Sequence, residues 1–187
     1  SKEYNKNWDK NLQHTYYPEE FKRTIYNNYS TNLYYSYNFF KENIQYIPRL
    51  KNFLIKQFPY LKYPLMVQCW GNIYQDNQKI LWHTHRIFKK IASRGLTSNI
   101  FIGGDENIGT TYAFPHKDIP RYNYVNVKNK LGYIQCVDQS IYHMVSENKS
   151  GRKRYSLGIT ITEFDVTYAK QFFNSYIMDE CGILILN

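Results

Sequence analysis

The chain has 187 residues, the size of one ordinary domain, and 43% of them are hydrophobic, which is enough to form a core. Its three cysteines, Cys69, Cys136 and Cys181, lie at long, irregular spacings that exclude a disulfide framework and a CxxC metal site, and this usage favours a reducing intracellular compartment. The net charge is +9 without a dense basic stripe, and no segment approaches the roughly 18 apolar residues that a transmembrane helix needs.

Residues 1–64 read as helices and loops that support the rest of the chain. Pro18 followed by two acids is a helix start, because proline fits the first turn and acids interact favourably with the positive end of the helix dipole. Three runs at helical spacing follow: Phe21, Ile25, Tyr29 and Leu33; then Phe39, Phe40, Ile44 and Ile47, interrupted by Pro48; then Leu50, Phe53, Leu54 and Phe58, ending at Pro59. Their apolar faces need a surface to cover, and we expect a sheet to provide it.

From Leu65 the pattern changes to short apolar runs separated by turn residues, and aromatic and Ile residues favour strands. The candidate strands are Leu65–Tyr74, Ile80–His85, Ser98–Ile102, Thr110–Phe114, Tyr122–Val127, Tyr133–Val137 and Tyr155–Phe164. This spacing is typical of a sandwich or a jelly-roll. We therefore predict one domain, mostly β with flanking helices: a helical region 1–64, a β core 65–164, and a tail 165–187 with a helix over Thr167–Met178 and an edge strand over Gly182–Leu186.

The strongest local motif is Trp82-His83-Thr84-His85. Residues two apart in a strand point to the same side, so His83 and His85 are expected to face one direction. Two imidazoles on one face suit a transition metal, although two hydrogen-bonded histidines on a polar face give the same pattern. A third imidazole, His143, follows the run Tyr133–Val137 after enough chain for several strands to return to the same place.

A second motif, Arg154-Tyr155-Ser156, opens the last long apolar strand. In a strand Arg154 and Ser156 share a face, and a guanidinium with a hydroxyl two residues later suits a carboxylate. An arginine at a strand start is otherwise an ordinary solvated charge, and Arg152 is the alternative for Arg154.

With these motifs in this order, the chain resembles the 2-oxoglutarate/Fe(II)-dependent oxygenases, most closely a branch whose members are often viral or marine bacterial. The similarity runs from about Trp70 to Ile161 and rests on motif order with few identities between the motifs. Trp70-Gly71-Asn72-Ile73-Tyr74 resembles the strand before the first ligand, and the segment from Leu96 to Ile102 resembles the next strand. His83-Thr84-His85 stands in place of the family's His-x-Asp, the segment from Gly132 to His143 resembles the strand of the distal His, and Arg154-Tyr155-Ser156 is similar to its Arg-x-Ser.

The resemblance implies a double-stranded β-helix (jelly-roll) core and an Fe(II) ion held by His83, His85 and His143. It also implies that the far carboxylate of 2-oxoglutarate is held by Arg154 and Ser156, with a contact from Tyr74. Such an enzyme decarboxylates 2-oxoglutarate to succinate and hydroxylates a small molecule or a peptide side chain. His85 departs from the family pattern, because the usual third ligand is a carboxylate.

Other interpretations remain open at this point. His116-Lys117-Asp118 is a literal His-x-Asp in a segment flanked by prolines. Three histidines also suit a zinc hydrolase or lyase, and a jelly-roll without catalysis is a third possibility. Nucleic acid is a less favoured partner, and the basic segment with Arg86, Lys89, Lys90 and Arg94 suits either an acidic substrate or a solvated helix face.

Overall fold

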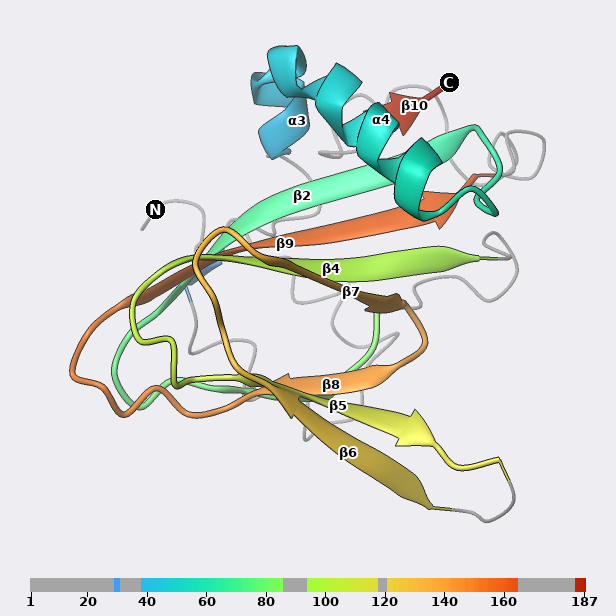
Figure 1. Cartoon of the computed structure of the whole chain (residues 1–187). Coiled ribbons are helices and arrows are strands. Elements are labelled where there is room, and N and C mark those ends of the chain that lie inside the picture. Colours follow the sequence, from blue (N-terminus) through green and yellow to red (C-terminus); the bar gives the residue numbers. More distant parts are fainter. Residues whose placement is uncertain (1–28, 31–37, 86–93, 118–120, 165–183) are drawn as a thin grey trace, which may run out of the picture.

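Two antiparallel sheets face each other, with helices on the outside of the larger one (Figure 1). The computed structural model describes residues 29–30, 38–85, 94–117, 121–164 and 184–187. The predicted class, mostly β with flanking helices, is confirmed. The division at residues 64 and 165 stays a prediction, and the predicted helix over Thr167–Met178 lies outside the described residues.

The larger sheet is built around two long strands, β2 (Leu65–Tyr74) and β9 (Arg154–Glu163), which pair along their whole length. β4 (Gly95–Gly103) pairs with the other edge of β9, and β7 (Ile134–Asp138) pairs with β4. The short strands β1 (Tyr29–Ser30) and β10 (Leu184–Leu186) pair with the free edge of β2. The predicted helical run through Tyr29 is therefore wrong at Tyr29 and Ser30, where the edge of β2 offers the backbone hydrogen-bond partners instead.

The smaller sheet has the order β3–β8–β5–β6. Its strands are β3 (Ile80–His83), β8 (Tyr142–Val145), β5 (Thr110–Pro115) and β6 (Tyr122–Val127). The predicted strand Ile80–His85 ends at His83. The segment from Gly132 to His143, compared above with a single strand, is two strands in different sheets: β7 in the larger and β8 in the smaller. A turn separates them, in which the Ile141 backbone N–H donates to the Asp138 carbonyl.

The helices cover the outer face of the larger sheet and form the hydrophobic core with it (Figure 1). They are α3 (Phe39–Glu42), the 3-10 helix η1 (Ile44–Tyr46) and α4 (Ile47–Gln57). Phe40, Leu50 and Leu54 pack against outward side chains of the sheet, which include Leu65, Val67, Leu96, Ile159 and Ile161. The prediction that Pro48 interrupts a helix is wrong. Pro48 lies in the first turn of α4, where its missing N–H leaves no helical hydrogen bond unmade. None of the described helices has the length and apolar composition needed to cross a bilayer.

The inner face of the larger sheet, which points toward the smaller sheet, carries many buried polar side chains beside apolar ones such as Trp70 and Phe101. Side chains alternate along a strand, so the residues next to the apolar ones of the core point inward. They include Gln68, Thr97, Arg154, Ser156, Thr160 and Thr162, all of them buried. The apolar core with the helices therefore lies on the outer face of this sheet, and the buried polar groups lie on its inner face.

Candidate metal centre and anion pocket

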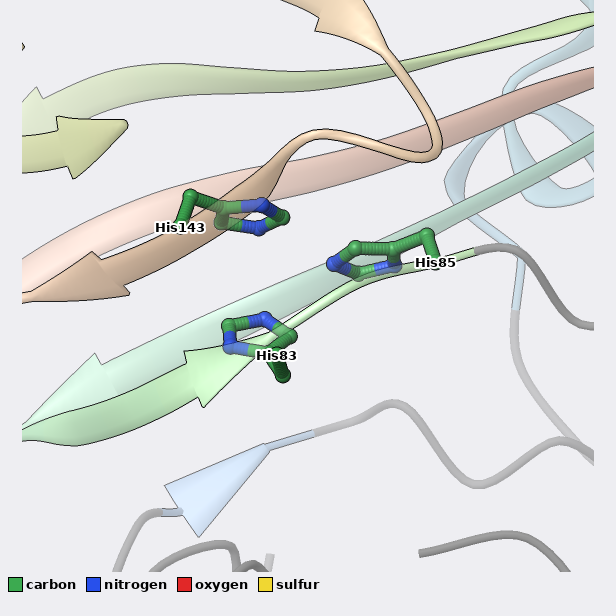
Figure 2. A group of neighbouring side chains, drawn as sticks. All are labelled: His83, His85 and His143. Carbon is green, nitrogen blue, oxygen red and sulfur yellow. The ribbon is translucent and has the colours of Figure 1, made fainter. Parts of the chain in front are cut away.

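His83, His85 and His143 converge between the two sheets (Figure 2). His83 and His143 are direct partners across the β3–β8 pair, and their ring centroids lie 4.2 Å apart. His85, just beyond the end of β3, brings its ring to 5.1 Å from His83 and 5.0 Å from His143. One ligand atom from each residue lies within 4.8 Å of the other two. Two nitrogens bound to one metal at about 2.1 Å each can be at most ~4 Å apart, so the three atoms need to move only slightly to share an ion. The structure thus brings together all three predicted ligands.

Contacts at Nδ1 orient two of these rings. His143 Nδ1 lies 3.1 Å from the Ile141 carbonyl oxygen, and His85 Nδ1 lies 3.3 Å from the Thr160 hydroxyl. A carbonyl accepts only from a protonated nitrogen, so His143 donates from Nδ1 and keeps the lone pair of Nε2 for a metal. Desolvation of the ring is the main cause that lowers the pKa of His85 well below its usual range, and repulsion from the charged forms of His83 and His143 adds to it. Desolvation also lowers the pKa of His143. Both imidazoles are therefore neutral at neutral pH, as a metal ligand must be.

The backbone at His85 is held by the segment between β7 and β8. The His85 N–H donates to the carbonyl of Gln139 at 3.1 Å, and the Gln139 N–H donates to the carbonyl of Gly95 at 3.0 Å. The Gln139 side chain is buried and accepts a hydrogen bond of 3.1 Å from the Thr162 hydroxyl. His85 is thus tied to the start of β4 although it follows the last residue of β3.

Arg154 occupies a buried pocket at the other predicted site. Its side chain is 0% exposed, and its guanidinium carbon lies 4.7 Å from the centroid of the Tyr74 ring. Its Nη2 donates a long hydrogen bond, 3.4 Å, to Oδ1 of Asn129. Burial raises the pKa of Tyr74, opposed by the charge of Arg154 and by contacts with Arg154 and Ser156, so these three predicted side chains lie together.

Five buried side-chain polar atoms lack a hydrogen-bond partner in the part of the chain that the structure describes. They are Asn99 Nδ2, Thr110 Oγ1, Arg154 Nε and Nη1, and Ser156 Oγ. Tyr74 approaches Ser156 closely enough to affect its own titration, but Ser156 Oγ makes no bond of acceptable geometry. By register all four residues belong to the interior between the sheets, on the same side as Trp70 or Tyr112. Unpaired buried donors are costly, so these atoms mark the part of the interior where a polar ligand could bind.

Tyr112 was missed by the sequence reasoning and lies beside both sites. Its ring centroid is 5.9 Å from that of His143, and its hydroxyl donates to Gln135 Oε1 at 2.9 Å. Burial raises its pKa to about 12, although the charge of Arg154 opposes the shift, so the phenol stays a donor at neutral pH. The signal in the sequence was the alternation along Thr110–Phe114, which does not reveal which face points inward.

Asn148 fixes the loop that leads into the Arg154 pocket. It is fully buried, and its side-chain amide donates to the carbonyls of Tyr74, Gln75 and Arg152, at 3.2, 3.1 and 2.6 Å. Its Oδ1 accepts from the Ser150 hydroxyl at 2.7 Å. The end of β2 and the start of β9 are thereby joined next to Arg154.

We expect Asn148→Ala to lower the free energy of unfolding by about 2–4 kcal/mol, because several buried carbonyls lose their donor together. Urea unfolding measures the change. The matched control is Asn126→Ala, which removes one exposed hydrogen bond to Thr111 and is expected to cost less than about 0.5 kcal/mol. Equal losses in the two variants would contradict this role of Asn148.

The alternative ligand pair is not part of the group of three. His116 follows β5 in the hairpin to β6, where its N–H donates to the carbonyl of Arg121, and Asp118 lies outside the described residues. Arg86, Lys89 and Lys90 also lie outside the described residues, while Arg94 is exposed just before β4. Arg152, the alternative to Arg154, is exposed in the loop before β9.

No family model matches the sequence, and no curated protein shows significant similarity to it. Solved structures match the fold. An oxidoreductase of the 2OG-Fe(II) oxygenase family from Burkholderia pseudomallei superposes with a TM-score of 0.52 at 15% identity, covering 65% of this chain and 54% of that one. EvdO2 from Micromonospora carbonacea var. aurantiaca, complexed with 2-oxoglutarate, gives 0.51 at 11% identity, covering 66% and 64%. The α-ketoglutarate-dependent epimerase SnoN from nogalamycin biosynthesis gives 0.51 at 13%, covering 66% and 56%.

The chain spans between about half and two thirds of the length of these solved chains. The two facing antiparallel sheets, with helices outside the larger one, agree with the predicted jelly-roll class. The chain therefore has the double-stranded β-helix (jelly-roll) fold of the 2-oxoglutarate/Fe(II)-dependent oxygenases.

Proposed function

We propose that the protein is an oxygenase that uses Fe(II) and 2-oxoglutarate to oxidise an organic substrate, with hydroxylation as the expected outcome. The observation that carries the proposal is the buried guanidinium of Arg154, whose Nε and Nη1 are unpaired beside the unpaired Ser156 hydroxyl, in the same interior as three convergent histidines. A dianion with one end on a metal and the other on an arginine fits this pair of sites.

His83, His85 and His143 would hold the ion, and the residues fit it because two of the rings already have partners at Nδ1. When bound, Fe(II) and 2-oxoglutarate supply the oxidising chemistry through decarboxylation of the cosubstrate to succinate. The protein supplies neutral ligands, a fixed orientation and an interior with little water.

Arg154, Ser156 and Tyr74 would hold the far carboxylate of the cosubstrate. The guanidinium and the serine hydroxyl are unpaired donors, and the Tyr74 ring stacks under the guanidinium and keeps it from turning away. Because the arginine is fully buried, its hydrogen bonds to a carboxylate would form in a low dielectric, where they are strong.

The substrate proposed is a small molecule or a peptide side chain. The strand β6 is an edge of the smaller sheet, and its residues are exposed except for the half-buried Val127. We propose that a substrate approaches along this edge.

The proposal is tested by the visible spectrum of the protein loaded with Fe(II) and 2-oxoglutarate without oxygen. We expect a weak metal-to-ligand charge-transfer band in the wild type and its loss in His83→Ala, since the metal loses a ligand that faces His143 across the strand pair. The matched control is His116→Ala, which removes a histidine outside the group of three and is expected to keep the band. A band lost in His116→Ala and kept in His83→Ala would favour the His-x-Asp alternative.

A zinc hydrolase or lyase is the second candidate, because the ligand set is entirely imidazole and three histidines with an open position suit zinc. It assigns no role to the unpaired Arg154. Wild-type protein that holds zinc tightly and gives no band with Fe(II) and 2-oxoglutarate would decide for this candidate.

A further inference from the structure

His85 stands where the resemblance described above implies a carboxylate, so its ring needs neighbouring groups to orient it toward a metal. A carboxylate orients itself by its two equivalent oxygens, whereas an imidazole ligates through one nitrogen and must be rotated correctly. We propose that Thr160 is the positioning residue of His85: its hydroxyl fixes the ring so that Nε2 is presented to the metal. The inference rests on the proposed metal site and adds to it a residue outside the ligand set.

Thr160 lies on the inner face of β9, in the middle of the larger sheet. It pairs with Gln68 on β2 and with Thr97 on β4, so its backbone is held from both sides. The residue is 1% exposed, and a β-branched side chain has few rotamers. Its hydroxyl therefore lies in a fixed place, 3.3 Å from His85 Nδ1.

This contact determines which nitrogen of His85 is available. If Nε2 binds the metal, the proton of the neutral ring is on Nδ1, which donates to the Thr160 hydroxyl oxygen. The backbone of His85 is held separately, by the carbonyl of Gln139. The hydrogen bond from the ring thus fixes what the backbone leaves free, the rotation of the imidazole.

Trp70 supports the same ring from its face. The indole and imidazole are stacked, with centroids 5.5 Å apart and an angle of 24° between the planes. Stacking sets the plane of the ring but allows two orientations related by a 180° flip about Cβ–Cγ, and only the bond at Nδ1 distinguishes them. Thr160 and Trp70 therefore restrict different rotations, and the threonine is the part that specifies Nε2.

The test is metal affinity, measured by the visible absorption of Co(II) titrated into metal-free full-length protein. Thr160→Val keeps the shape and removes the hydroxyl, and we expect a loss of Co(II) affinity of about 10- to 100-fold together with a changed Co(II) spectrum. Thr160→Ser restores the hydroxyl and is expected to restore both.

The matched control is Thr111→Val. Thr111 on β5 lies on the face opposite to Tyr112, away from the histidines, and its hydroxyl accepts a hydrogen bond of 2.8 Å from Asn126 Nδ2. We expect this variant to lose some stability and to keep the wild-type spectrum. Thermal unfolding of the metal-free variants separates loss of folding from loss of the site.

A double-mutant cycle with His85→Ala isolates the contact, because Thr160→Val should have no further effect on Co(II) affinity once the ring is absent. Unchanged affinity and spectrum in Thr160→Val, or an equal loss in Thr111→Val, would overturn the role of Thr160. Failure of the proposed function has a different signature: Co(II) binds and depends on Thr160, but 2-oxoglutarate leaves the spectrum unchanged. Wild-type protein that binds no Co(II) would overturn both.

Discussion

Arg154→Met is expected to make the protein more stable and unable to bind 2-oxoglutarate. A buried guanidinium that lacks a carboxylate partner pays a desolvation penalty that one long hydrogen bond and an aromatic face do not offset. Methionine has a similar reach and fills irregular space without a charge. We expect the free energy of unfolding to rise by about 1–3 kcal/mol, in the range seen when buried ionic groups are replaced by apolar ones.

The same substitution removes the partner of the cosubstrate carboxylate. Truncating one partner of a buried charge pair costs about 2–5 kcal/mol, so we expect at least a roughly 30-fold loss of 2-oxoglutarate affinity. The measurement is the melting temperature with and without 2-oxoglutarate in the presence of Co(II), because a ligand that binds only the folded state raises it. The wild type should respond and Arg154→Met should not.

Arg152→Met is the control for charge and composition. Arg152 is exposed two residues earlier in the chain, and we expect neither its stability nor its response to 2-oxoglutarate to change. If Arg154→Met were less stable than the wild type while still responding to 2-oxoglutarate, the buried guanidinium would be a structural group and the pocket would have another ligand.

The sequence predicted strands and site residues where they depend on local patterns along one strand. The bounds of β2 and β6 follow from apolar runs bounded by turn residues, and the end of α4 follows from Phe58-Pro59. The three histidines were identified because alternation in a strand places His83 and His85 on one side. The Arg154–Ser156 face was found in the same way.

The parts that could not be predicted depend on register between strands far apart in the sequence. Nothing local to Tyr133–Val145 shows that β7 and β8 belong to different sheets, because the change requires only the short turn at Asp138. The contact of Thr160 with His85 and the hydrogen bonds of Asn148 likewise join distant segments. The inward polar face of β9 was also hidden, since Ser156, Thr160 and Thr162 are ordinary strand residues until the packing shows that the core lies on the other side.

Gly158→Ala is expected to disturb the metal centre although the residue touches no histidine. Gly158 faces Trp70 across the β2–β9 pair, and a Cβ at this position would lie 2.6 Å from two carbons of the indole ring. Contacts under 3.0 Å require something to move, and here the neighbour is a rigid ring on a central strand. We expect the indole to shift, and because the ring of His85 is stacked on it, the imidazole is expected to shift as well.

Overpacking of this kind costs about 1–3 kcal/mol of folding free energy, and a displaced ligand lowers metal affinity by about 10-fold or more. Urea unfolding measures the first effect and Co(II) titration the second. Gly103→Ala is the matched control, because on the neighbouring strand β4 the new Cβ would meet only Tyr155, at 3.9 Å. Adding Trp70→Leu to Gly158→Ala should give a more stable protein than the sum of the two single changes predicts, because the clash disappears with the indole. Co(II) affinity should not recover, because the surface on which His85 stacks disappears too. Full Co(II) affinity in Gly158→Ala together with full affinity in the double variant would show that the imidazole keeps its orientation without the indole, leaving the hydroxyl of Thr160 as sufficient to hold it.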